Sequence, residues 1–196
     1  MSEDARPHRP GRYADLTGFI DAAGGELPSS RAEMAAATAQ VVLQAGRSPG
    51  DGARFVALSD RVGMETLAAL WKDSDPVSLP GALWALYLLR EWCRTDTAEV
   101  IRLWRAGEPF AQPDAAVAGV GDYADVEGVQ RAADAILSGL YQGDFDVALE
   151  RAAALFHVIA VGRRETGSDL GMADRNDRAA AALRVAAARW REGTLH

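Results

Sequence analysis

The sequence predicts an all-α protein, a single-domain bundle or array of antiparallel helical hairpins with about eight or nine helices. Three observations predict this class. Alanine is abundant and occurs in runs such as residues 35–37 and 179–182, and alanine is the strongest helix former. Apolar residues recur at spacings of three and four along most of the chain. Glycine, proline and capping residues interrupt these patterns often, which predicts short connections between neighbouring helices.

Composition and charge exclude several classes of protein. Of the 196 residues, 48% are hydrophobic, so the chain can bury a core, and the net charge of -7 disfavours general binding to nucleic acid or anionic membranes. Cys93 is the only cysteine, which excludes an intramolecular disulfide and a thiolate metal cluster and suits a reducing compartment. The charged N-terminus lacks the apolar region of a secretory signal, and the longest apolar run is far below the roughly 20 residues that span a bilayer. We therefore expect a cytoplasmic protein without a membrane segment.

The chain is expected to form one folded unit. We expect residues 1–10 to be a flexible tail and residues 11–196 to be a single helical domain, with a possible subdivision in the 107–125 loop. The first expected helix carries an apolar stripe and ends at a glycine pair, Gly24 and Gly25. The stripe consists of Tyr13, Leu16, Phe19, Ile20 and Ala23.

Three further helices are expected before residue 73. The first of them begins at Ser30, which forms a capping box with Glu33, and ends at Gly46. Its predicted inward stripe consists of Met34, Ala37, Val41 and Ala45. A turn over residues 47–52 precedes a helix with Phe55, Leu58 and Val62 inward. The next helix covers residues 64–72 and directs Leu67, Leu70 and Trp71 inward.

The central, buried helix is expected near residues 79–94. Residues 82–89 are consecutively apolar, which is typical of a helix covered on all sides. Pro80 suits the first turn, where its missing N–H costs nothing. Asp96 is expected to begin the following helix, whose apolar side includes Leu103 and Trp104, and Gly107 is expected to be its C-cap.

The remaining chain is expected to hold one long loop and three helices. Residues 108–125 contain prolines and glycines and predict an irregular loop with one helical turn over 114–118, and long loops often carry function. Asp125 is expected to cap the next helix, and Gly143 with Asp144 to turn into another. The last helix is expected over residues 174–192, with Asp174 and Asp177 in capping roles.

Three segments resemble known motifs. Residues 141–149, with Gly143-Asp144-Phe145 followed by Ala148, resemble the hairpin centre of a tetratricopeptide repeat, but the flanking positions depart from that pattern and favour a generic αα-hairpin. Residues 54–73 resemble a helix-turn-helix, but Lys72 is the only cation on its second helix. Residues 119–124 have dinucleotide-loop spacing without a preceding strand, which favours an ordinary loop.

No residue meets the requirements of a catalytic, cofactor-binding or metal site. His157 is the only internal histidine, and the sequence identifies no acid–base partner for it. Cys93 has no neighbouring base that would make it a nucleophile. We therefore expect no cofactor and no metal, and we interpret both side chains as packing residues.

Tryptophan provides the only candidate binding residues. Trp71, Trp84, Trp92 and Trp104 fall within one segment, and tryptophan is enriched in cores and in interface hot spots alike. Leu70-Trp71-Lys72 and Leu103-Trp104-Arg105 are similar triplets, spaced by the period of a helical repeat. We predict that Trp71, Lys72, Trp104 and Arg105 bind a partner, with Trp71 or Trp104 partly exposed. A tryptophan-rich core is the alternative.

The sequence favours a non-enzymatic helical protein that binds another protein or itself. One alternative is a DNA-binding or transcription-linked regulator that uses residues 54–73. Another is a small-molecule binder or enzyme with an interhelical pocket lined by Trp and Tyr, with His157 and the 107–125 loop at its mouth. Residues 79–109 resemble a helical protein family of high-GC bacteria, and this resemblance implies a fold and no activity.

Overall fold

The computed structural model describes residues 30–120 and 125–196, and within these ranges the protein is helical and has no strand. The predicted all-α class is confirmed. The helices are α2 (Arg31–Gly46), α3 (Gly52–Val56), α4 (Leu58–Val62), α5 (Met64–Trp71), α6 (Leu79–Thr95), α7 (Thr97–Gly107), the 3-10 turn η1 (Glu108–Phe110), α8 (Gln112–Ala118), α9 (Val126–Gln142), α10 (Phe145–Glu165) and α11 (Leu170–Arg191). The tail expected over 1–10 and the helix expected over 13–23 lie outside the described residues.

Capping residues set several of the helix ends where the sequence places them. The capping box at Ser30 is confirmed, because the Glu33 N–H donates to Ser30 Oγ at 3.2 Å and the Ser30 N–H donates to Glu33 Oε2 at 3.0 Å. Asp125 caps α9 by accepting from the Gly128 N–H at 2.6 Å. Gly143, with φ of +105°, ends α9 in the left-handed conformation that glycine adopts without strain.

The helix predicted over residues 79–94 is the buried helix α6. Ten of its 17 residues are buried, and α5 and α7 both pack against it. Ser78 caps it by accepting from the Gly81 N–H at 3.3 Å, and Pro80 lies in its first turn. Gly81 allows this turn to form, because a Cβ there would lie 2.1 Å from the Asp75 carbonyl oxygen.

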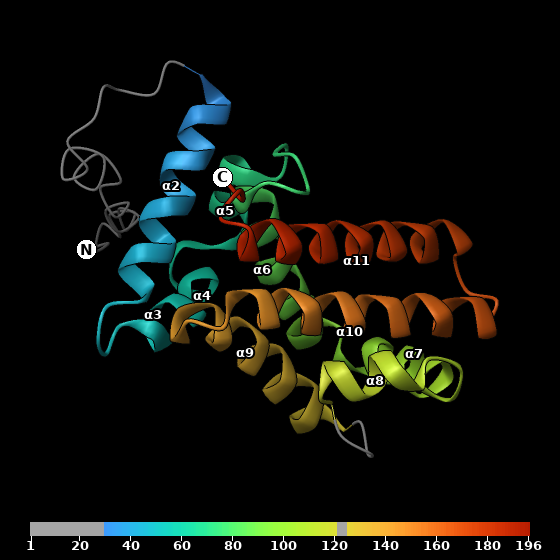
Figure 1. Ribbon diagram of the computed structural model, residues 1–196. Coiled ribbons are helices and arrows are strands. Elements are labelled where there is room, and N and C mark those ends of the chain that lie inside the picture. The colour runs from blue at the N-terminus through green and yellow to red at the C-terminus, as the bar shows by residue number, and fades with distance from the viewer. Residues whose placement is uncertain (1–29, 121–124) are drawn as a thin grey trace, which may run out of the picture.

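A second helix, α10, connects most of the molecule. It packs against α7, α8, α9 and α11, and 13 of its 21 residues are buried. Figure 1 shows α10 and α11 side by side as two long helices, with α7 and α8 along the opposite side of α10 and α2 to α5 gathered at one end. The buried apolar side chains form one continuous cluster that runs from Ala35 to Leu195.

Gly107 is a packing residue, and its predicted role as a left-handed C-cap is wrong. Its φ is -89°, and the chain continues from α7 directly into η1. A Cβ on Gly107 would lie 2.0 Å from the Val158 carbonyl oxygen, and a Cβ on Gly162 would lie 1.9 Å from the Leu103 carbonyl oxygen. The two glycines therefore let the backbones of α7 and α10 come into contact.

Two other sequence predictions need correction. The inward face of α2 consists of Ala35, Thr38, Ala39, Leu43 and Gly46, not the predicted stripe that begins at Met34. Alanine occurs on every side of α2, so the sequence pattern does not show which side is buried. The buried side also includes the polar residue Thr38, whose Oγ1 accepts a hydrogen bond from the Trp71 indole N–H at 3.1 Å.

The last helix begins four residues earlier than predicted. Asp169, not Asp174, caps α11 by accepting from the Met172 N–H at 3.0 Å, so Asp174 and Asp177 lie inside the helix. The segment after residue 107 is also more regular than expected, because η1 and α8 occupy most of it. Gly119 then ends α8 with φ of +71°.

Candidate functional site

The two predicted interface tryptophans are core residues. Trp71 is 0% exposed and Trp104 is 1% exposed, so the expectation that either is partly exposed is wrong. Each tryptophan lies one helical turn after another buried residue, Leu67 on α5 and Val100 on α7, and shares its inward face. Their neighbours Lys72 and Arg105 lie on the exposed sides of the same helices.

The four predicted residues do not form one surface. α5 packs against α2, α4 and α6, whereas α7 packs against α6, α9, α10 and η1. Trp71 is accounted for as a packing residue, since its ring lies 6.1 Å from that of Tyr87 and its indole N–H is paired with Thr38. Trp104 differs, because its buried indole Nε1 has no hydrogen-bond partner among the described residues.

Trp104 lines a hollow between α7 and α8, which we call the α7–α8 hollow. Its volume is about 600 Å³. The lining residues are Trp104, Glu108, Pro109, Gln112, Ala115, Ala116 and Gly119. Five of the seven lining residues are apolar or glycine, and the polar side chains are Glu108 and Gln112. An apolar hollow with a few polar groups is typical of a binding site for an apolar group.

An exposed aromatic residue lies in the turn that carries part of this lining. Phe110, the last residue of η1, is 67% exposed, the largest exposed fraction among the large apolar side chains of the described residues. Val117 on α8 is 50% exposed. Phe110 directly follows Pro109 of the hollow, and Val117 follows Ala116. Phe110 and Val117 thus belong to the elements that line the hollow, but neither is among its lining residues.

The hollow matches part of one sequence prediction. The expected interhelical pocket is lined by Trp and Tyr with the 107–125 loop at its mouth; Trp104 and residues of that segment do line the hollow, but no tyrosine does. His157, expected at its mouth, is not among the lining residues. Phe110 is not among the residues predicted from the sequence, although an aromatic residue after a proline in a long predicted loop was an available signal.

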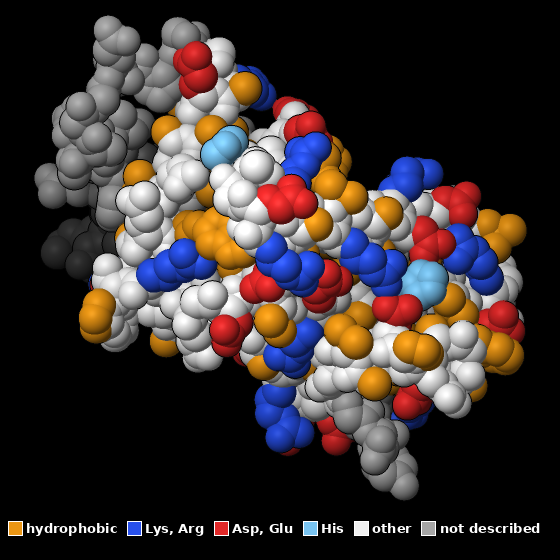
Figure 2. Space-filling view, viewed as in Figure 1, with side chains coloured by type: hydrophobic (Ala, Val, Ile, Leu, Met, Phe, Trp, Pro, Cys, Tyr) orange, Lys and Arg blue, Asp and Glu red, His pale blue; other side chains and the backbone are white. Residues whose placement is uncertain are grey.

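His157 has the carboxylate partner that the sequence alone did not reveal. Its Nδ1 lies 3.0 Å from Asp177 Oδ1 and its Nε2 lies 3.8 Å from Asp114 Oδ2. Arg184 pairs with Asp114 at 2.6 Å, and Arg164 pairs with Asp177 at 2.5 Å. These charges connect α8, α10 and α11, and Figure 2 shows blue and red side chains in a band across this face. The carboxylates are already paired, so we interpret the cluster as a link between helices.

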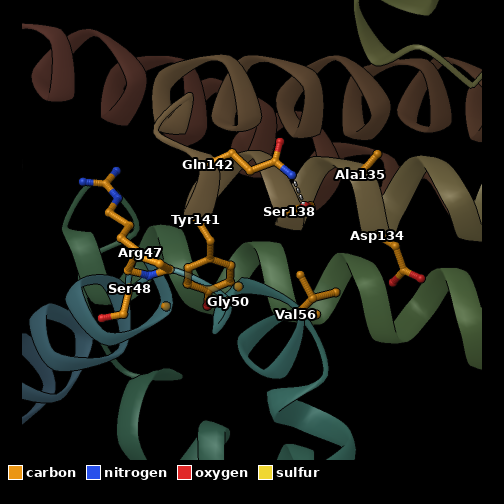
Figure 3. Close-up of a pocket in the computed structure, with 13 residues that line it drawn as sticks. Arg47, Ser48, Gly50, Val56, Asp134, Ala135, Ser138, Tyr141 and Gln142 are labelled. Atoms are coloured by element: carbon orange, nitrogen blue, oxygen red, sulfur yellow. Dashed lines mark hydrogen bonds between the residues drawn. The ribbon is translucent and has the colours of Figure 1, made fainter.

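A second hollow, between α9 and the segment 46–56, lacks converging polar groups. Its volume is about 650 Å³. Figure 3 shows the side chains of Arg47 and Asp134 at opposite ends of this hollow, and Gln142 turned toward Ser138. The Arg47 guanidinium lies 5.0 Å from the Trp190 ring, and Asp134 pairs with Arg90. Its polar side chains are therefore used by the fold itself.

The other predicted motifs find limited structural context. The Gly119 loop follows α8 rather than a strand, and residues 121–124 lie outside the described residues. In the segment 54–73, α5 has eight residues and buries Leu67 and Trp71, so its exposed side offers mainly Glu65 and the following Lys72. Residues 141–149 form the hairpin between α9 and α10 that both of its interpretations predict.

Two negative observations concern the described residues only. Within them, no group of three or more His, Cys, Asp or Glu side chains is placed to hold a metal ion. None of the helices in the same ranges has the length and apolar character needed to cross a membrane.

Comparison of the chain with protein-family models, with curated proteins and with solved structures finds no match.

Proposed function

We propose that this chain is a non-enzymatic helical protein that binds another protein through the α7–α8 hollow and the adjacent Phe110. The observation that carries the proposal is the exposure of Phe110, 67%, in the turn η1 that contributes Glu108 and Pro109 to the hollow. A large aromatic side chain gains free energy when it leaves water, and aromatic residues dominate interface hot spots. The fold leaves most of the Phe110 side chain exposed to water, so we infer that a partner protein buries it.

The hollow also defines what the partner must offer. Its apolar lining residues fit an apolar side chain of the partner. Glu108 at the hollow and the net charge of -7 favour a neutral or basic partner surface, because like charges slow association. Another protein meets this description better than a second copy of the chain, which carries the same negative charge, and the experiment separates the two.

The test compares two exposed apolar residues that are changed to the same charge. Phe110→Asp places a carboxylate beside the hollow, whereas Val147→Asp, at a site that is 50% exposed at the start of α10, is the control. Neither change removes a buried side chain, so both variants should keep the wild-type melting temperature. Proteins retained by the three immobilised chains are quantified, and self-association is measured by sedimentation.

The expected result is a partner, or a concentration-dependent dimer, that wild type and Val147→Asp bind and Phe110→Asp loses at least tenfold. Equal binding by Phe110→Asp and Val147→Asp would overturn the proposal. A dimer lost only in Phe110→Asp would identify the partner as a second copy of this chain.

A small-molecule binder is the second candidate, and the size of the hollow favours it, because a volume of about 600 Å³ is within the range of ligand sites. A thermal-shift screen tests this function. A ligand that raises the melting temperature of wild type and not of Gln112→Ala supports it, whereas an equal shift in both would place the ligand elsewhere.

A further inference from the structure

Helix α6 is buried over ten of its residues but keeps one apolar side open to water. Trp84, Leu88 and Trp92 follow one another at intervals of four residues, so they lie along one face of the helix, which we call the α6 stripe. Leu88 is 43% exposed, and both tryptophans are half-buried. A stripe of this composition is typical of a surface that another helix covers.

The tryptophans of the chain therefore differ in what they contribute. Trp71 and Trp104 are core residues, whereas Trp84 and Trp92 pack against the core and keep part of their side chains exposed. The core contact holds these two side chains in place before any partner binds. A large aromatic side chain that is already held loses little conformational entropy on binding, which is why tryptophan is enriched in interface hot spots.

The carboxylates that border the α6 stripe are unpaired. Glu91 lies three residues after Leu88, and Asp96 lies four residues after Trp92, so both belong to the same side of the helix as the stripe. Neither carboxylate forms an ion pair with another of the described residues. Both are free to pair with cations of a partner.

Two cations near the stripe are already used by the fold. The Arg163 guanidinium lies 5.5 Å from the Trp92 ring, pairs with Glu99 at 3.2 Å, and belongs to a side chain that is 6% exposed. Arg94 on α6 pairs with Asp60. The unpaired charge beside the stripe is therefore negative, like the net charge of -7, and it is complementary to a basic partner.

We propose that the α6 stripe binds a basic amphipathic helix of another protein. One face of such a helix supplies apolar side chains that cover the two tryptophans and Leu88, and its Lys or Arg side chains pair with Glu91 and Asp96. A second copy of the chain is disfavoured, because two stripes in contact would bring like carboxylates together. The inference goes beyond the proposed function, since the stripe and the α7–α8 hollow share no residue.

The test uses the full chain and two synthetic amphipathic helices as probes. Both peptides carry leucine at helical spacing, and the remaining positions are lysine in one peptide and glutamate in the other. Leu88→Gln removes the centre of the stripe, and Val185→Gln, at a site on α11 that is 45% exposed, is the matched control. Neither substitution affects a buried residue, so both variants should keep the wild-type melting temperature.

Calorimetry should show that the lysine peptide binds wild type about tenfold more tightly than the glutamate peptide does. Leu88→Gln should weaken binding of the lysine peptide by about tenfold, and Val185→Gln should leave it unchanged. Equal affinity of wild type for the two peptides, or equal binding by the two variants, would overturn the proposal. A wild-type dimer that Leu88→Gln lacks would also overturn it, because the occupant would then be a second copy of the chain.

The charge complementarity is tested by removing two carboxylates at a time. Glu91→Gln combined with Asp96→Asn should weaken binding of the lysine peptide by about fivefold. The control combines Asp144→Asn with Glu192→Gln, which neutralises two exposed acids outside α6 and changes the net charge equally. Equal weakening in both double variants would mean that the peptide follows the overall charge, which would contradict the proposal.

Tryptophan fluorescence locates the bound peptide, because neither peptide contains tryptophan. Binding should reduce quenching by acrylamide in wild type and in Trp190→Phe, and much less in the double variant Trp84→Phe with Trp92→Phe. Phe110→Asp should bind the lysine peptide as wild type does. If Phe110→Asp loses the peptide and Leu88→Gln retains it, the peptide occupies the α7–α8 hollow, so this inference fails while the proposed function stands.

Discussion

Arg90 is the buried charge on which the packing of α6 depends. Its side chain is 6% exposed, its Nε donates to Asp134 at 2.7 Å, and its Nη2 donates to Asp60 at 3.1 Å. Ser59 accepts from Nη1 at 3.1 Å. The guanidinium thus links α4 and α9 to α6, and it holds the pKa of Asp60 below its usual value through their hydrogen bond.

The first prediction concerns the two ways of breaking this cluster. Removing both carboxylates, with Asp60→Ala and Asp134→Ala, leaves a buried cation without its partners and should lower the free energy of unfolding by about 3 kcal/mol. Arg90→Met should cost less, about 1 kcal/mol, because the carboxylates that remain are partly exposed and regain water. Urea unfolding measures both. A larger loss in Arg90→Met than in the double variant would contradict this account.

The second prediction concerns the thiol of Cys93. Its side chain is fully buried on α6, and burial, aided by the negative charge of Asp134, raises its pKa to about 12. Because the thiolate is the reactive form, the folded protein should resist thiol reagents at pH 8. Labelling followed by mass spectrometry should show reaction in urea and almost none in buffer. Rapid labelling of the folded chain would mean that this part of α6 opens readily.

At the scale of the elements, contact between α7 and α10 rests on Gly107 and Gly162. The third prediction is that Gly162→Ala destabilises the protein by about 1–3 kcal/mol, since its new Cβ would overlap the Leu103 carbonyl oxygen. The higher helix propensity of alanine than of glycine stabilises the variant by about 1 kcal/mol. The sign of the change in the free energy of unfolding therefore shows which effect is larger.

Gly139→Ala is the matched control for that experiment. Gly139 lies within α9, and its Cβ would meet Ala148 Cβ at 3.6 Å, an ordinary contact. The substitution should therefore leave stability unchanged or raise it by up to about 1 kcal/mol. Thermal unfolding compares the two variants. If both were stabilised, the close contact between α7 and α10 would be excluded.

The elements themselves could largely be predicted from the sequence, because their ends depend on local chemistry. Ser30, Asp125 and Gly143 define helix ends through side-chain caps or backbone conformation that neighbouring residues alone determine. The inward face of α2 could not be predicted from the sequence, because alanine occurs on all sides of this helix and several helices that pack against it are distant in the sequence. Gly107 was predicted as a residue at a helix end. Its packing role depends on Gly162, which lies far from it in the sequence, on α10.

The candidate site was less predictable than the fold, because it depends on contacts between residues that are distant in the sequence. Burial of Trp104 and exposure of Phe110 both depend on how α7 and η1 sit against α10. The sequence does identify the 107–125 segment as a place where function is expected, and the α7–α8 hollow lies in it. The partner of His157, Asp177, is twenty residues away on another helix and follows only from the pairing of α10 with α11.

At the scale of the whole molecule, a buried hydrogen-bonded pair joins three helices. Tyr87 on α6 donates to the Phe55 carbonyl oxygen on α3 at 2.6 Å, which leaves Tyr141 on α9 to donate to Tyr87 Oη at 2.5 Å. Burial raises the pKa of both phenols well above their usual value.

Residues 195 and 196 also pack against the fold. The Leu79 N–H donates to the His196 carbonyl oxygen at 2.9 Å, and Leu195 is buried.

The fourth prediction is that the Tyr87–Tyr141 pair makes the molecule sensitive to alkali. The unfolded chain loses its phenolic protons near pH 10, whereas the folded chain keeps them, so the folded state binds more protons above that pH. Stability is therefore full below pH 10 and falls as the pH rises further, by up to about 1.4 kcal/mol per pH unit for each tyrosine. Urea midpoints between pH 8 and 11.5 measure this dependence.

Tyr141→Phe separates this effect from general alkaline repulsion. The variant loses one titrating phenol and one hydrogen bond, while Tyr87 keeps its bond to the Phe55 carbonyl oxygen. It should be less stable than wild type at pH 8 by about 1 kcal/mol, and its stability should fall less steeply above pH 10. Parallel pH profiles for the two proteins would show that Tyr141 titrates alike in the folded and unfolded states, and that it is not buried in the core where α2, α3, α6 and α9 meet.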